Sequence, residues 1–268
     1  MKKLIVLALS LLLVAFCFAQ DTSVVYFDHA NKITSKKKAI TWAKRYKVGK
    51  AWGLDSYNTD GFVASTTTCS DKDCTIKNGP QILYNEKGRE MQLITYAANQ
   101  LDGPFIYYYE NGEKQMEGNY STDKKTGDWV GYFASGKIAG KAHYEDNNQV
   151  SASFLNEDGT ARSSLDSFYR PASYMGGDKA WIRLLTKNLR YPQEAQDNEV
   201  QGTVTIRFTV KTDGKPDNFA IDWSMQPFLE QETLRMVKMM PDWVPAIIGG
   251  QITEVQMKKA VTFKLENG

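Results

Sequence analysis

The sequence contains little histidine, cysteine or proline, and its charges nearly cancel. It has two histidines, three cysteines and eight prolines in 268 residues, with a formal net charge of +2. Such a small net charge supplies no general attraction for nucleic acid, so we expect no nucleic-acid partner. The HExxH, GxSxG, phosphate-loop and dinucleotide glycine motifs are also missing. We therefore predict that the protein is not an enzyme and holds no cofactor and no metal ion.

A long apolar run occurs only at the N-terminus. Lys2 and Lys3 precede an almost wholly apolar stretch from Leu4 to Phe16. This stretch is shorter than the roughly 20 residues of a membrane-spanning helix. Cys17-Phe18-Ala19 follows it as a small-x-small cleavage pattern. The pattern predicts a secretory signal peptide over residues 1–19, with an uncleaved anchor as the alternative.

Removal of the leader leaves two cysteines, Cys69 and Cys74, in the polar stretch TTTCSDKDCTIKNG. An even number of cysteines in an exported protein favours a disulfide, which here closes a small loop. Two free surface thiols are the alternative. A metal site is disfavoured, because neither histidine lies near the pair in the sequence.

The middle of the chain repeats with a period of 24 residues. Four positions are identical in three successive copies, and a partial copy at 153–159 and a degenerate copy at 57–61 flank them. The identical positions are Gly79, Gly103 and Gly127; Tyr84, Tyr108 and Tyr132; Gly88, Gly112 and Gly136; Tyr96, Tyr120 and Tyr144.

Each copy predicts a β-hairpin. In the second copy, the aromatic strand Phe105–Tyr109 enters a turn at Glu110–Gly112 and returns through a strand that ends at Tyr120. The recurring tyrosines are expected to stack as a ladder along the sheet, with ligand or partner contact as the alternative. Two strands a unit at about 4.8 Å each give roughly 10 Å a repeat, so four or five units make a rod of about 40–50 Å.

The aromatic pair, glycine turn and closing Glu-Gly-x-Tyr of YYENGEKQMEGNY resemble the MORN-repeat variant family. The resemblance covers roughly residues 45–160 and is strongest over 79–150. It implies a β-sheet interaction or spacer module, with residues 20–160 as one domain. The preceding segment, VVYFDHANKITSKKKAITWAKRYKVGKAW, is expected to add the first strands.

The C-terminal region has a different pattern. Residues 161–173 read as a linker, and residues 174–268 as a second domain. The order helix, strand, strand, helix, strand predicts an α+β fold with a three-stranded antiparallel sheet. The first expected element is a helix over 179–189, which Asp178 caps and Pro192 ends or redirects. Strands at 203–211 and 219–223 follow, and then a helix that ends at Pro241. A loop through Trp243–Pro245 and Gly249–Gly250 leads to a last strand over 255–265.

This order and its landmarks resemble the TonB C-terminal domain. The matching features are MGGDKAWIRLLTKNLRYPQEA, Gly202-x-Val204, Asp213–Gly214 at the hairpin, LRMVKMMP and Trp243-x-Pro245. Two features depart from the family: apolar Ala246–Ile248 replaces a polar or basic loop, and Ser224-Met225 stands where a glycine is common. These departures bear on the choice of partner rather than on the fold.

The resemblance implies a partner-binding edge. TonB-like domains bind an extended peptide, the TonB box of an outer-membrane receptor, which adds a strand beside the last strand of the domain. The residues assigned to partner binding on this basis are Tyr191, Pro192, Val255, Met257, Lys259, Val261 and Phe263. Lys259 and Lys264 also suit the protection of an exposed sheet edge. For Tyr191–Pro192 the alternative is a structural helix stop with a packed ring.

Two functional hypotheses follow. The first is a periplasmic TonB-like energy transducer for transmembrane transport, with inner-membrane motor proteins as partners if the N-terminus stays anchored. The anchor is normally an uncleaved helix followed by a long proline-rich spacer, whereas this leader reads as cleavable and the chain has eight prolines. The second hypothesis is a soluble periplasmic binding or scaffold module that uses the same edge and the repeats. A homodimer is left open.

Overall fold

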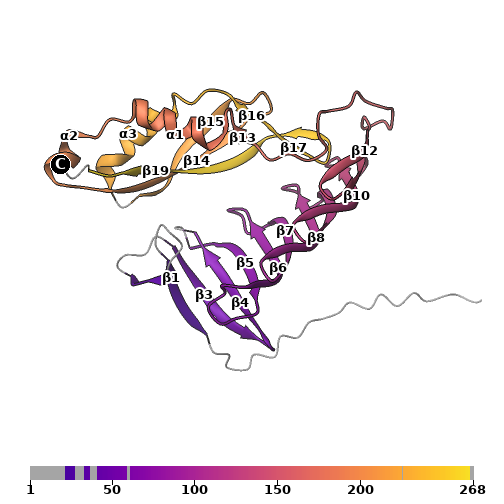
Figure 1. The fold of residues 1–268 in the computed structure, drawn as a ribbon, viewed down its shortest axis with the longest axis horizontal. Coiled ribbons are helices and arrows are strands. Elements are labelled where there is room, and N and C mark those ends of the chain that lie inside the picture. The colour runs from indigo at the N-terminus through magenta and orange to yellow at the C-terminus, as the bar shows by residue number, and fades with distance from the viewer. Residues whose placement is uncertain (1–21, 28–32, 37–40, 59–60, 225, 266–268) are drawn as a thin grey trace, which may run out of the picture.

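The computed structural model consists of two β-rich regions that follow one another along the chain (Figure 1). It describes residues 22–27, 33–36, 41–58, 61–224 and 226–265, so the predicted signal peptide at 1–19 lies outside the described residues. The first region is a long antiparallel sheet of hairpins, and the second is a small α+β unit with few helices. Both parts of the predicted fold class are confirmed.

The first region forms a 12-stranded sheet in which neighbours in sequence are neighbours in space, except that β1 lies between β3 and β2. Twelve strands at about 4.8 Å spacing give a sheet roughly 50 Å long. The strands are β1 (Ser23–Phe27), β2 (Ile33–Thr34), β3 (Thr41–Val48), β4 (Ala51–Tyr57), β5 (Val63–Cys69), β6 (Lys77–Tyr84), β7 (Glu90–Ala97), β8 (Gln100–Tyr108), β9 (Lys114–Ser121), β10 (Lys124–Tyr132), β11 (Ile138–Glu145) and β12 (Asn148–Phe154).

The turns inside the repeat units share one geometry. In the first unit, the Gly88 N–H donates to the Asn85 carbonyl and the Asn85 N–H donates to the Arg89 carbonyl, both at 2.9 Å. The equivalent bonds recur in the next two units. Gly88, Gly112 and Gly136 have φ angles of 73°, 90° and 81°. These angles lie in the left-handed region that glycine enters without a steric penalty, which explains the repeated glycine.

The turns between units are joined by a ladder of hydrogen bonds that was not predicted from the sequence. The Lys77 N–H donates to Asn99 Oδ1 and the Lys125 N–H donates to Asn147 Oδ1, both at 2.7 Å. Asp123 Oδ1 accepts the equivalent bond at 2.7 Å in the unit between them. Asn99, Asp123 and Asn147 are also 24 residues apart. The change from Asn to Asp obscured this part of the repeat.

Trp129 lies between two of the repeat tyrosines in the core of the repeat sheet. Its side chain is 0% exposed, and its ring centroid lies 5.4 Å from that of Tyr120 and 5.7 Å from that of Tyr144. The two repeat tyrosines therefore pack through an intervening indole, which corrects the expected tyrosine stack. A Cβ on Gly118 would lie 2.1 Å from Trp129 Cδ2, so the glycine makes room for the larger ring.

The second region contains a three-stranded sheet in the order β15-β14-β19, covered on one face by helices. Its elements are β13 (Ser173–Tyr174), α1 (Gly177–Asn188), α2 (Gln193–Asp197), β14 (Gly202–Val210), β15 (Pro216–Ser224), α3 (Pro227–Val237), β16 (Trp243–Val244), β17 (Ala246–Ile248), β18 (Gln251–Thr253) and β19 (Val255–Phe263).

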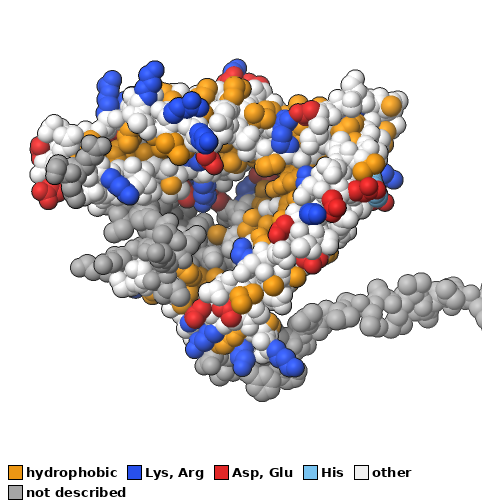
Figure 2. All heavy atoms as spheres, in the orientation of Figure 1, with side chains coloured by type: hydrophobic (Ala, Val, Ile, Leu, Met, Phe, Trp, Pro, Cys, Tyr) orange, Lys and Arg blue, Asp and Glu red, His pale blue; other side chains and the backbone are white. Residues whose placement is uncertain are grey.

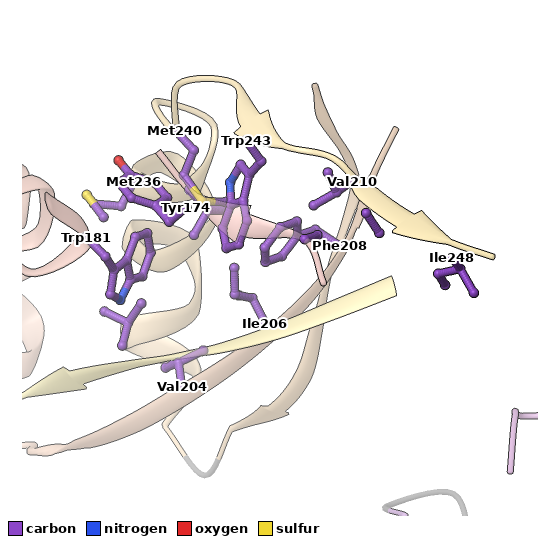
Figure 3. Close-up of a cluster of buried hydrophobic side chains, with 14 of the residues drawn as sticks. Tyr174, Trp181, Val204, Ile206, Phe208, Val210, Met236, Met240, Trp243 and Ile248 are labelled. Carbon is purple, nitrogen blue, oxygen red and sulfur yellow. The ribbon is translucent and has the colours of Figure 1, made fainter. Parts of the chain in front are cut away.

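Strand β14 is the buried centre of this sheet. Val204, Ile206, Phe208 and Val210 are each at most 1% exposed. They point into the same apolar cluster as aromatic and methionine side chains from α1, α3 and the segment after α3 (Figure 3). The alternating pattern of the sequence therefore predicted the core correctly, because a strand with one covered face buries every second residue.

Two local predictions about this region were wrong. Gly176, not Asp178, is the N-cap residue of α1, and no side chain caps this helix; Asp178 lies in the first turn instead. The expected loop through Trp243–Pro245 and Gly249–Gly250 contains two short strands, β16 and β17, and β18 follows it directly. β17 and β18 pair with each other as a hairpin, whereas β16 pairs with β13, which is distant in the sequence.

We call residues 246–253, which form β17, β18 and the turn between them, the docking hairpin. It packs against the repeat sheet. Ala246–Ile248 is at most 3% exposed, and the Gly249 N–H donates to Met116 Sδ at 3.2 Å. Gln251 Nε2 donates to the Tyr132 carbonyl at 2.8 Å. The apolar departure from the TonB pattern therefore contacts another part of the same chain.

The segment predicted as a linker, residues 161–173, runs between the repeat sheet and the docking hairpin. Phe168 is 0% exposed, and its carbonyl accepts a hydrogen bond from the Gly250 N–H at 2.8 Å. Arg170 and Ile247 exchange two backbone hydrogen bonds of 2.8 Å.

The two regions also meet at a second place, where Arg207 of β14 forms an ion pair with Glu86 in a turn of the repeat sheet. Figure 2 shows a hollow between the two regions, with hydrophobic side chains on its wall.

Candidate partner-binding edge

Strand β19 forms one edge of the C-terminal sheet. All nine of its residues are in antiparallel register with β14, from Val255 opposite Val210 to Phe263 opposite Gly202. Among the described residues, β14 is the only strand that pairs with β19. Since every strand has hydrogen-bonding groups along both sides, the outer side of β19 offers a row of backbone donors and acceptors.

The structure places four of the predicted site residues with their side chains in or against the core. Val261 is 0% exposed and Phe263 is 1% exposed. Val255 and Met257 are half-buried and pack against the same apolar cluster. These side chains help to hold β19 onto the domain, and their part in partner binding stays a prediction.

The opposite face of β19 is exposed and carries the polar groups. It presents Gln256, Lys258, Ala260 and Thr262. Lys258 Nζ pairs with Asp222 Oδ2 of β15 at 2.9 Å, and the hydroxyls of Thr262 and Thr203 lie 2.9 Å apart. A neighbouring strand would place every second side chain over this exposed face as well, because cross-strand neighbours lie about 5 Å apart. The residues predicted from the sequence lie on the other face of β19.

Lys259 connects β19 to the start of α1. Its Nζ lies 3.1 Å from Asp178 Oδ1, and its side chain is 24% exposed. The Asp178 carboxylate also lies in the first turn of α1, where the helix dipole favours negative charge. The lysine that breaks the apolar alternation of the last strand is therefore explained by an ion pair with a helix terminus.

Tyr191 and Pro192 lie beside the C-terminal end of β19. The Tyr191 hydroxyl donates to the Val200 carbonyl at 2.6 Å, and its ring packs edge-on against Phe263 with centroids 5.7 Å apart. Burial raises the pKa of the Tyr191 hydroxyl. Pro192 is the N-cap residue of α2, a short helix that the sequence analysis did not predict. The pair thus has a structural role as well as a place next to the predicted edge.

Glu232 fixes the segment that carries Tyr191. Its carboxylate accepts hydrogen bonds from the Arg190 N–H at 2.6 Å and from Arg235 Nε at 2.7 Å. Burial raises the pKa of this carboxyl group, but the bonds from Arg235 and Arg190 outweigh it and leave the pKa below its ordinary value. The bond from Arg190 to Glu232 and a 2.7 Å bond from Arg235 Nη2 to the Asn188 carbonyl tie the end of α1 to α3.

The predicted disulfide is present at the other end of the molecule. Cys69 and Cys74 are bonded, and Cys69 is 0% exposed. The loop between them carries Asp73, whose carboxylate pairs with Arg45 of β3 at 2.5 Å. Arg45 Nε in turn donates to Ser23 Oγ of β1 at 3.2 Å. The disulfide loop therefore holds the first strands of the repeat sheet together.

Within the part of the chain that the structure describes, no three His, Cys, Asp or Glu side chains are grouped to hold a metal ion. None of the described helices combines the length and the apolar character needed to cross a bilayer.

Residues 187–265 match the family model described as the Gram-negative bacterial TonB protein C-terminal. The match begins near the end of α1 and takes in the whole of the β15-β14-β19 sheet. This is a family of protein-interaction domains without enzymatic activity, and at a general level the match supports a TonB-like protein of the cell envelope. No curated protein matches the chain. The relation of the first region to MORN repeats stays a prediction.

Proposed function

We propose that this protein binds TonB-dependent outer-membrane receptors from the periplasm, by adding the receptor's TonB-box peptide as a strand beside β19. The observation that carries the proposal is the outer side of β19, which pairs with no other strand of the described residues and lies within the stretch that matches the TonB C-terminal model. Backbone hydrogen bonds supply the affinity in this mode, and the exposed side chains supply the specificity.

The β19 edge carries lysines and no acidic residue of its own, which suits an extended peptide with acidic groups. Lys258 and Lys259 are each already paired with an aspartate of this domain, and Lys264, just after the strand, is exposed. Opposite charges across a strand pair stabilise the pairing, while like charges oppose it. The same lysines disfavour association of two β19 edges with each other.

A proline pair tests the proposal. Successive N–H groups of a strand point to opposite sides, so only one of the two variants Lys258→Pro and Lys259→Pro loses an N–H from the free edge. We expect that variant to keep its fold and lose capture of outer-membrane receptors from envelope extracts, with the whole protein as bait. Lys258→Ala and Lys259→Ala remove the same side chains but keep the N–H groups, and serve as matched controls. Undiminished receptor capture by the folded proline variant would refute strand addition at β19.

A second candidate function is a binding or scaffold module that transmits no force. The extent of the repeat sheet and its contacts with the docking hairpin favour it, because they give the β19 edge a fixed orientation on a rigid support. Sequencing the N-terminus of the mature protein separates the candidates. An intact leader favours energy transduction through inner-membrane motor proteins, whereas a terminus at Gln20 favours the scaffold.

A further inference from the structure

The repeat sheet ends in an incomplete unit. After β12 the chain forms the usual turn, in which the Gly159 N–H donates to the Asn156 carbonyl at 2.9 Å. In complete units, return strands of 8 residues follow this turn, as β7, β9 and β11 do. Here the pairing stops after the Leu155–Ala161 bridge and a 2.9 Å bond from the Arg162 N–H to the Phe154 carbonyl.

The chain is diverted toward the docking hairpin at this point. Arg162 Nη2 donates to the Gly250 carbonyl, and the Gly250 N–H donates to the Phe168 carbonyl at 2.8 Å. The Phe168 N–H donates back to Gln149 Oε1 of β12 at 2.9 Å. The segment that would have been the return strand therefore contacts the C-terminal region instead. Among the described residues, β11 is the only strand paired with β12, which lies at the end of the sheet farthest from β1 (Figure 1).

The outer side of β12 is accessible. All six residues from Asn148 to Ser153 are exposed, and Val150 is 58% exposed. The Phe154 carbonyl points to the outer side, because it accepts the bond from Arg162. Backbone groups two residues apart point to the same side of a strand, so the N–H and carbonyl of Ala152 also face outward.

β12 lacks the charged residues that the free edges β15 and β19 carry, although its pairing with β11 has one register shift, between Gln149 and Ser151. Its sequence, NQVSASF, contains no charged residue and no proline. By contrast, β19 contains Lys258 and Lys259, and β15 contains Asp217 and Asp222. Charged side chains on an edge oppose pairing with another chain, so an exposed and uncharged edge is a template for a further strand.

We propose that β12 of a second copy of this chain occupies the empty strand position and joins the two repeat sheets into one continuous antiparallel sheet. The two copies are related by a twofold axis near Ser151. An antiparallel pair of identical strands is self-complementary, so each copy supplies the strand that the other lacks. The strand has no charge to be repelled by its own copy. This interface is separate from β19, which stays available in both copies.

A single proline tests this dimer. Ala152→Pro removes an N–H from the outer side without removing a hydrogen bond to β11, and Ala152→Ser, which keeps that N–H, is the matched control. A pair of single strands buries little surface, so we expect concentration-dependent association in sedimentation velocity. The wild type and Ala152→Ser shift from monomer to dimer, and Ala152→Pro stays monomeric. A wild type that is monomeric at all concentrations, or an Ala152→Pro variant that dimerises like it, overturns the proposal.

A charge variant covers the case in which proline disturbs the strand itself. Ser151→Lys combined with Ser153→Lys places two lysines on the edge without altering the backbone, and we expect a monomer. Thr212→Lys combined with Gln196→Lys adds the same charge at exposed positions of the C-terminal region, and we expect the dimer to persist. Equal loss of the dimer in both double variants would show a nonspecific effect of charge and contradict the β12 interface.

Engineered cysteines locate the axis. Ser151→Cys brings two thiols together across the proposed twofold axis, where Cα atoms of directly opposed residues lie about 4.5–5.5 Å apart, within disulfide range. With oxidised glutathione we expect a disulfide-linked dimer. Thr212→Cys, which is equally exposed but distant in the fold, is expected to stay monomeric under the same conditions. Equal cross-linking of the two variants contradicts the proposed interface.

Discussion

Gly131 of β10 and Gly249 of the docking hairpin meet backbone to backbone. A Cβ built on Gly131 would lie 2.1 Å from the Gly249 carbonyl oxygen. A Cβ built on Gly249 would lie 2.7 Å from Gly131 Cα. Neither position has room for a side chain, so the contact between the two regions depends on glycine in both.

Substitution of Gly131 should therefore separate the two regions. We expect Gly131→Ala to destabilise the docked state by about 1–3 kcal/mol, because the added methyl group meets backbone that cannot rotate away. Hydrogen exchange should accelerate in residues 246–253 and much less in β6–β9. Gly202→Ala is the control, since its added Cβ would meet a flexible Gln226 side chain at 3.3 Å. Unchanged exchange in the docking hairpin would contradict the account of this contact.

Trp129 should dominate the stability of the repeat sheet. It is 0% exposed and contacts the repeat tyrosines on both sides. We expect Trp129→Ala to lower the free energy of unfolding by about 3–5 kcal/mol in urea titrations. Val150→Ala, which truncates a side chain that is 58% exposed, should change it by less than about 0.5 kcal/mol. Similar losses in both variants would contradict the assignment of Trp129 to the core.

The Cys69–Cys74 disulfide should stabilise the first strands rather than the whole chain. Its loop is short, so we expect reduction to lower stability by about 2 kcal/mol. Faster hydrogen exchange should be confined to β1, β3 and β5. Cys69 lies in β5, Arg45 of β3 pairs with Asp73 of the loop, and Arg45 also bonds to Ser23 of β1. Cys69→Ser combined with Cys74→Ser should exchange in the same way and no longer respond to reductant. Equal acceleration in β14 would contradict a local role.

The sequence predicted most of the fold because the repeats carry local signals. Turn glycines with positive φ and alternating strands specify each hairpin, and the alternation in β14 specified the C-terminal core. The docking hairpin was not predicted, because the residues that it contacts, such as Met116 and Tyr132, are distant in the sequence. The edge position of β19 was expected from a family resemblance. Its exposed face was not named, because the prediction followed the apolar positions of the strand. Lys259 interrupts those positions and forms an ion pair with Asp178 of α1.

Glu232 should make stability depend on pH. The pKa of Glu232 in the folded protein lies below its ordinary value of 4.5. Its contribution to the free energy of unfolding is therefore fully present above pH 4.5, and it is lost as the pH falls through the lower pKa of the folded state. We expect Glu232→Gln to cost about 2 kcal/mol at pH 7 and clearly less at pH 3, measured by urea unfolding. Glu230→Gln, two residues earlier in α3, is the control. A loss for Glu232→Gln that does not change with pH would contradict the ion pair with Arg235.

Hydrogen exchange of the β19 amides during peptide binding tests the central claim most directly. The probes are synthetic peptides that cover the N-terminal segments of outer-membrane receptors from the same cell envelope. Because successive N–H groups of an edge strand alternate between β14 and solvent, the account predicts new protection at every second amide between Val255 and Phe263. Peptide binding that leaves these amides unprotected, or that protects β12 or β15 in their place, would contradict it.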